Sequence, residues 1–221
     1  DVLTGVRNPS GRLPMTWPLS FYDIPSSHNF PIDCPEGQFV DHATGQWGRT
    51  PTGLKNIDFS EYAEGINVGY RYFTTAGKSV AYPFGYGLSY TTFAYSKAAA
   101  GVAKDGSVKV KVTVTNTGDT AGKEVVQVYV SAPAGGLEKP VRELKAFAKT
   151  RLLNPGESQT LEMTIDNYSL ASFNENVSAW ETARGTYGVH VGANVEDIRC
   201  NASFKLSKAQ RWPVNDVLHL K

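Results

Sequence analysis

The chain has 221 residues and a formal net charge of +1, from 22 basic and 21 acidic side chains. Apolar residues make up 41% of it, which is too many for a disordered chain. The near-zero charge argues against binding to nucleic acid or to an anionic membrane, because those partners require clustered Lys and Arg. No apolar run approaches the roughly 20 residues that span a bilayer. Asp1 is followed by no secretory-signal pattern, which fits either a processed chain or a piece of a longer one.

Residues 1–91 hold most of the prolines and many glycine–aromatic clusters, but only short stretches with helix or strand periodicity. A segment of this length rarely buries its own core without such patterns. We therefore expect it to be connecting chain that packs on another domain, one that this sequence does not contain.

Two features of residues 1–91 could carry chemistry. Asp58, Glu61 and Glu64 form a local acidic cluster, which could supply a pair of catalytic carboxyls or could simply be solvated. The aromatic residues around it could stack on sugar rings or anchor the segment to its host domain. These aromatic residues are Trp47, Tyr62, Tyr70, Tyr72, Phe73, Tyr82, Phe84 and Tyr86.

Residues 92–207 have a different pattern. Valine alternates with Lys or Thr over residues 108–115, which is the period of a half-buried strand. Residues 124–131 are expected to form a mostly buried strand, and a helical turn is predicted at 169–173. Further strands are predicted at 145–153, 158–165, 186–192 and 198–206. About seven short strands separated by turn residues predict a mainly β fold, an antiparallel β-sandwich.

The reactive side chains are few and scattered. His28, His42, His190 and His219 have no metal-ligand spacing, so we expect no metal site and no cofactor. His190 alternates within a strand pattern and is expected at the surface or at a pocket edge. Cys34 and Cys200 are 166 positions apart and are interpreted as two free thiols, with a disulfide as the alternative.

Five blocks of sequence resemble the C-terminal part of family 3 glycoside hydrolases, in the order found in the bacterial β-glucosidase branch. The first runs from Asn8 to Pro18 (NPSGRLPMTWP), and the next two are Glu64–Phe73 (EGINVGYRYF) and Tyr82–Phe93 (YPFGYGLSYTTF). Downstream, Lys139–Phe147 (KPVRELKAF) and Leu153–Glu157 (LNPGE) resemble the family's fibronectin-III-like domain.

This resemblance implies a fibronectin-III-like antiparallel β-sandwich at 92–207, followed by a C-terminal tail at 208–221. Residues 1–91 would then be the extended C-terminal segment of the family's α/β sandwich domain. Residues 26–59 would be a loop inserted into that segment, since shorter family members lack it. The partners implied are the upstream barrel and α/β sandwich domains and a β-linked glycoside; a homodimer is also conceivable.

The resemblance also implies a retaining, exo-acting β-glycosidase that is periplasmic or extracellular. The family's catalytic aspartate and glutamate lie upstream of these blocks, so we assign no catalytic residue to this chain. Trp47 and Arg49 of the inserted loop are the candidate substrate-binding residues, by stacking on a sugar and by paired hydrogen bonds to hydroxyls. The alternative for the loop is packing only. The alternative for the chain is a stand-alone carbohydrate-binding or adhesion module.

Overall fold

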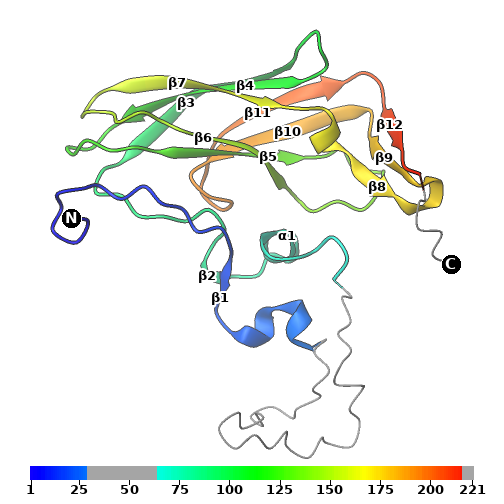
Figure 1. Cartoon of the computed structure of the whole chain (residues 1–221), viewed down its shortest axis with the longest axis horizontal. Helices are drawn as coiled ribbons and strands as arrows, with labels where there is room; N and C mark the ends of the chain where they lie inside the picture. The colour runs from blue at the N-terminus through cyan, green and yellow to red at the C-terminus, as the bar shows by residue number, and fades with distance from the viewer. Residues whose placement is uncertain (29–63, 216–221) are drawn as a thin grey trace, which may run out of the picture.

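The computed structural model describes residues 1–28 and 64–215, and its main body is an antiparallel β-sandwich (Figure 1). One sheet has three strands in the order β3-β4-β7, and the other has four in the order β11-β10-β5-β6. The strands are β3 (Phe93–Val102), β4 (Val108–Asn116), β5 (Val125–Ser131), β6 (Glu143–Lys149), β7 (Ser158–Ile165), β10 (Gly185–Gly192) and β11 (Ile198–Leu206). The predicted mainly β fold and its sandwich architecture are confirmed.

The alternation in β4 places its valines in the core between the two sheets. Val108, Val110, Val112 and Val114 are fully buried, whereas Lys111 is exposed on the opposite face. Valine suits this position because its branched side chain fits a pleated surface that is half buried. The facing sheet contributes valines from β5 and β10, together with Tyr187 stacked on Phe204 at a ring-centroid distance of 5.1 Å.

A small three-stranded sheet lies at one end of the sandwich and is called the accessory sheet below. Its strands, in the order β12-β9-β8, are β8 (Ser172–Asn174), β9 (Ala179–Thr182) and β12 (Gln210–Pro213). β12 lies within the stretch predicted as a tail, and it forms a strand because its backbone pairs with β9. The helical turn predicted at 169–173 is a 3-10 helix at Tyr168–Leu170, after which β8 begins.

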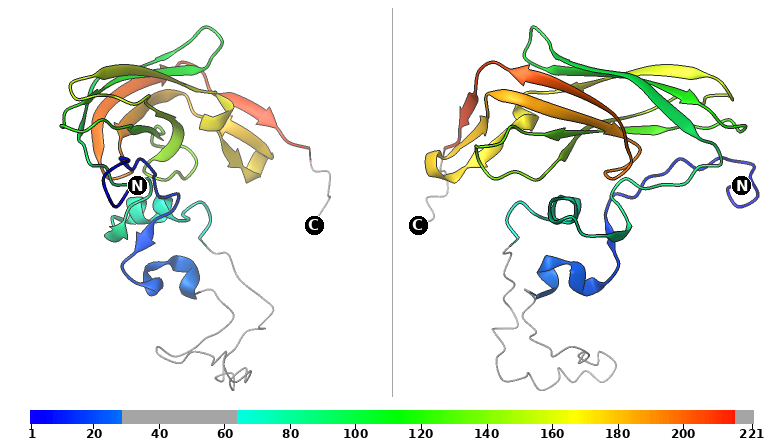
Figure 2. Two further views of the ribbon diagram at one scale, coloured as in Figure 1. Left: turned by 60° about the vertical axis from the view of Figure 1, so that its left-hand side comes forward. Right: turned by 180° about the vertical axis from the view of Figure 1, so that it is seen from behind.

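The N-terminal segment runs along the side of the sandwich that bears β5, β6 and β10 (Figure 2). It contains β1 (Trp17–Pro18) paired with β2 (Val80–Tyr82), two 3-10 helices (Phe21–Asp23 and Pro25–His28) and one short helix. This helix, α1 (Tyr70–Ala76), ends at Gly77, whose φ of 63° is the left-handed conformation that glycine adopts without strain. In the described residues, no helix is long and apolar enough to cross a bilayer.

Candidate functional site

The candidate site of this chain is the interface between the N-terminal segment and the sandwich. The two blocks at 8–18 and 82–93 lie against each other, although more than sixty residues separate them. The Leu13 amide donates to the Tyr86 carbonyl at 2.8 Å, and the Gly85 amide donates to the Leu13 carbonyl at 2.9 Å. The blocks therefore form one ordered unit, which then contacts the sandwich.

Asn8 anchors the first block at three points. Its side-chain amide donates to the Ala121 carbonyl at 3.1 Å, while its oxygen accepts from the Ser89 hydroxyl at 3.0 Å and the Tyr90 amide at 2.9 Å. One side chain thus joins both blocks to the loop before β5. Only a short amide supplies donors and an acceptor in this geometry.

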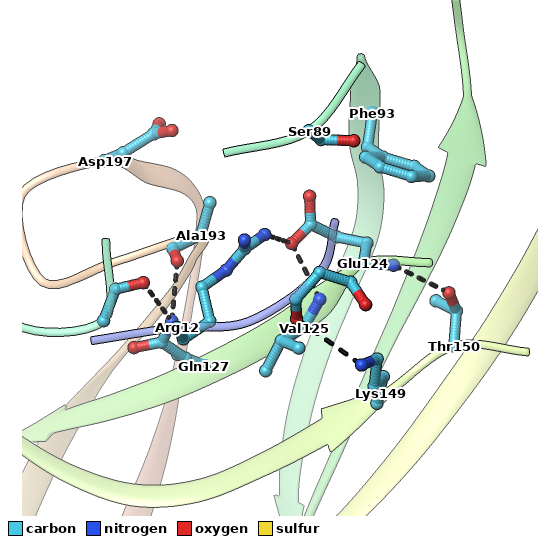
Figure 3. A network of polar contacts seen from close by, with 12 residues as sticks. Arg12, Ser89, Phe93, Glu124, Val125, Gln127, Lys149, Thr150, Ala193 and Asp197 are labelled. Carbon is cyan, nitrogen blue, oxygen red and sulfur yellow. Dashed lines mark hydrogen bonds and ion pairs between the residues drawn. The ribbon is translucent and has the colours of Figure 1, made fainter. Parts of the chain in front are cut away.

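Arg12 and Glu124 form a buried ion pair across the interface (Figure 3). Their side chains are only 12% and 4% exposed, and the residues are 112 positions apart in the sequence. Glu124 also accepts from the Val125 amide at 2.7 Å, and its own amide donates to the Thr150 hydroxyl at 3.0 Å. Because both charges are desolvated, each depends on the other, and removing one leaves a costly unpaired charge.

Gln127 makes the second polar contact of the interface, beside the ion pair in Figure 3. Its side-chain amide donates to the carbonyls of Gly85, at 3.0 Å, and Ala193, at 2.6 Å. Its oxygen accepts from the Tyr129 hydroxyl at 2.6 Å. Gly85 has a φ of 83°, and a Cβ built on it would lie 2.0 Å from the Gln127 oxygen, so both backbone and space require glycine here.

Aromatic contacts complete the interface. Tyr70 of α1 stacks on Phe84 at 4.5 Å between ring centroids and meets the ring of Tyr129 edge-on at 6.2 Å. The Tyr70 hydroxyl accepts from the Leu144 amide at 2.9 Å. Tyr129 is fully buried, and this burial raises the pKa of its hydroxyl. Tyr70 and Phe84 therefore anchor the segment to the sandwich of this chain, whereas the sequence suggested anchoring to a host domain outside it.

Other aromatic residues of the segment remain exposed on a groove of about 550 Å³. Trp17, Tyr82 and Leu88 are 52%, 46% and 67% exposed and line the same groove, and apolar side chains gathered in this way are typical of an interaction surface. The groove also includes Pro9, Gly11, Arg12, Leu13, Tyr86 and Gly87. Its lining is mainly apolar, so contact with another protein surface would be more favourable for it than contact with water.

The predicted substrate-binding residues Trp47 and Arg49 lie outside the described residues, as do Cys34, Asp58 and Glu61. Glu64 is described, and its backbone carbonyl accepts from the Asn67 amide at 3.0 Å. In the described ranges, no three His, Cys, Asp or Glu side chains gather as metal ligands would. Cys200 carries a free thiol, and burial raises its pKa.

His190 lies half-buried on the outer face of the four-stranded sheet. Its ring nitrogens lie 3.0 Å from the Ser131 hydroxyl and 2.8 Å from the Asn201 side-chain oxygen. These contacts join neighbouring strands, so His190 is part of a hydrogen-bonded row on the sheet surface.

Sequence reasoning did not single out Arg12, Glu124 or Gln127 as interface residues. A signal for two of them exists: Glu124 precedes and Gln127 interrupts an otherwise apolar run, EVVQVYV. Polar groups in such a strand need buried partners. The sequence alone does not say where those partners come from.

A sandwich of three plus four antiparallel strands is the architecture of fibronectin-III-like domains. The model of the fibronectin type III-like domain family matches residues 124–195.

Known β-glucosidases match the chain along nearly its whole length. β-Glucosidase B of Emericella nidulans is 40% identical over 90% of this chain and 22% of its own length. The thermostable β-glucosidase B of Acetivibrio thermocellus is 36% identical over 99% of this chain and 27% of its own length. The structure of β-glucosidase 3B from Thermotoga neapolitana in complex with glucose aligns with a TM-score of 0.81 and 42% identity, over 97% of this chain and 27% of that one.

The structure of a GH3 β-glucosidase from Bifidobacterium adolescentis aligns similarly, with a TM-score of 0.80 and 33% identity, over 98% of this chain and 29% of that one. The chain corresponds to the C-terminal part of family 3 glycoside hydrolases, so the resemblance of the five blocks is confirmed. It spans about a quarter of the length of the curated relatives it matches, which therefore contain further domains.

Proposed function

We propose that this chain is the C-terminal portion of a retaining, exo-acting β-glycosidase of the β-glucosidase type, which removes terminal β-linked sugars. Its main role is structural: the sandwich holds the end of the α/β sandwich domain in place. The observation that carries this proposal is the docked segment, fixed by a buried ion pair, a glutamine and aromatic anchors. A stand-alone sugar-binding module needs no such segment.

The exposed groove around Trp17, Tyr82 and Leu88 is the surface that the rest of the α/β sandwich domain would cover. Covering these side chains removes apolar area from water, which favours association by roughly 25 cal/mol for each Å². The residues missing from this chain, including the nucleophile and the acid/base, would come from that domain and from the barrel. The chain alone is therefore expected to have no glycosidase activity, because hydrolysis needs two carboxyls beside the scissile bond.

Residues 26–59 are proposed to reach the rim of the substrate pocket, with Trp47 stacking on the leaving-group sugar and Arg49 binding its hydroxyls. This position suits a long loop, since loops on a rigid scaffold commonly carry binding residues. A periplasmic or extracellular location is proposed as well, on the resemblance to the family.

The test is to express the parent reading frame and to assay hydrolysis of an aryl β-glucoside, reading the anomer of the released sugar by NMR. The proposal expects activity with retention of configuration in the complete protein and none in the 221-residue chain. An inactive complete protein, or release of the inverted anomer, would contradict it. Activity in the short chain that is lost on Glu64→Gln would instead assign catalysis to the acidic cluster.

A further inference from the structure

A second cavity, of about 410 Å³, lies between the accessory sheet and the connection from β5 to β6. It is near β9 and β12 in Figure 1. The connection from β5 to β6 also contacts the N-terminal segment, since the Asn67 side-chain amide donates to the Glu138 carboxylate at 3.1 Å. Its apolar wall is formed by Pro133, Leu137, Ala183 and Ala209. This volume is within the range of small-molecule sites, which are mostly apolar with a few placed polar groups.

On one polar wall of the cavity, an acidic and a basic side chain neutralise each other's charge. Arg211 lies with its Nε 2.5 Å from the Glu181 Oε1, and the Asn174 amide donates to the Glu181 Oε2 at 2.7 Å. The hydrogen bonds from Asn174 and Arg211 lower the pKa of Glu181, so it is ionised at neutral pH. Glu181 and Arg211 therefore add no net charge to the cavity.

Lys139 is the charge at this cavity that has no direct ion pair in the described residues. Its side chain is half-buried, and in the described part of the chain no carboxylate forms an ion pair with its ammonium. The Glu143 carboxylate acts on it from a longer distance and is itself paired with Arg71 and Lys145, at 3.2 Å each. Burial lowers its pKa, which shows that the charged form loses hydration here. A desolvated cation with no anion in direct contact is costly, and an anion beside it recovers that cost.

Lys139 and Ser172 also have hydrogen-bond donors left to use. The ammonium donates to the Ser172 hydroxyl oxygen, which accounts for one of its three N–H groups. Within residues 1–28 and 64–215, no protein acceptor takes the hydroxyl hydrogen of Ser172. Lys139 lines the cavity, and Ser172 adjoins the cavity through its bond with Lys139. Two N–H groups and one O–H group thus remain for a ligand, an arrangement that matches the two oxygens of a carboxylate.

We propose that this cavity binds a small organic carboxylate, whose oxygens are held by Lys139 and Ser172 while its apolar body lies against Pro133, Leu137, Ala183 and Ala209. The charge selects an anion, and the apolar wall selects one with a hydrophobic body over an inorganic ion. This site is independent of the proposed glycosidase function.

The test is a titration of the ¹⁵N-labelled 221-residue chain with sodium benzoate, followed by the amide signals of Ala183 and Ala209. Benzyl alcohol is the uncharged match in size and shape. We expect saturable shifts with benzoate and at least tenfold weaker binding of benzyl alcohol. Lys139→Met should weaken benzoate binding at least tenfold and Ser172→Ala several-fold, because each removes a donor to a charged group. Lys205→Met, an exposed change on β11, should leave binding unchanged.

Several results would overturn the proposal: no saturable shift, equal binding of benzyl alcohol, or equal binding by the Lys139→Met variant. Phosphate or chloride producing the same shifts at the same concentrations would reduce the site to a general anion site and also overturn it. Ser172→Ala retains the lysine and changes one hydroxyl, so it keeps the test decisive if Lys139→Met does not fold.

Discussion

Arg12→Met removes the cation of the buried pair and leaves the Glu124 carboxylate inside the interface. Breaking a buried ion pair by removing one partner costs about 3–5 kcal/mol. Both side chains are at most 12% exposed, so water does little to screen the remaining charge. Glu124 keeps its hydrogen bond from the Val125 amide, so the expected loss in free energy of unfolding is near the lower end of this range, at about 3 kcal/mol.

This loss should appear in two measurements. Urea unfolding followed by circular dichroism should show the lower stability, and Tm should fall by about 6–12 °C for a chain of this size. Hydrogen exchange should also speed up at the amides of Leu13 and Gly85, whose bonds hold the two blocks together. Faster exchange there with little change in the core amides of β4 would mean that the segment undocks before the sandwich unfolds.

Two controls separate pairing from side-chain loss. Arg12→Met combined with Glu124→Gln removes both charges, and it should be more stable than Arg12→Met alone because no unpaired charge remains. Lys111→Met breaks an ion pair with Glu162 whose side chains are 57% and 50% exposed, and it should cost less than about 0.5 kcal/mol. Equal losses from Arg12→Met and Lys111→Met, or a double variant as unstable as the sum of its parts, would refute the reasoning.

Three further predictions follow from single positions. Val112→Ala should lower the free energy of unfolding by about 1–3 kcal/mol in chemical denaturation, because apolar burial is lost and a cavity forms. Lys111→Ala should change it by less than about 0.5 kcal/mol. Equal effects would mean that the buried face of the strand is assigned wrongly. Gly85→Ala should destabilise by about 2 kcal/mol or more, since its φ is 83° and its Cβ would overlap a buried side chain. Gly101→Ala, with open space around it, should be nearly neutral, and the same loss at both glycines would contradict the argument. In the complete enzyme, Trp47→Ala should lower kcat/KM several-fold on oligosaccharides while sparing a small aryl glucoside; equal losses, or none, would reject its role at the leaving-group sugar.

The sequence by itself determined the sandwich, because strand alternation is a local property. The valines of residues 108–114 must share one face of a strand, and a face made of four valines must be buried. The turn at Asn154–Glu157 is local as well, and the structure closes it with a bond from the Glu157 amide to the Asn154 carbonyl at 2.9 Å. The five blocks likewise identify the family without any three-dimensional information.

Only the tertiary structure decided what covers the outer face of β5. The run at 124–131 predicts a mostly buried strand, and Gln127 and Tyr129 on its outer face are indeed 3% and 0% exposed, but the run does not say what covers them. They are buried because α1 and Phe84 pack over that face, and these contacts join positions distant in sequence. The helix itself is seven residues long and has no side-chain cap, so packing rather than helix propensity stabilises it. The pairing of Arg12 with Glu124 is decided in the same way: a local pattern shows that a buried charge needs a partner, but only the folded chain brings that partner to it.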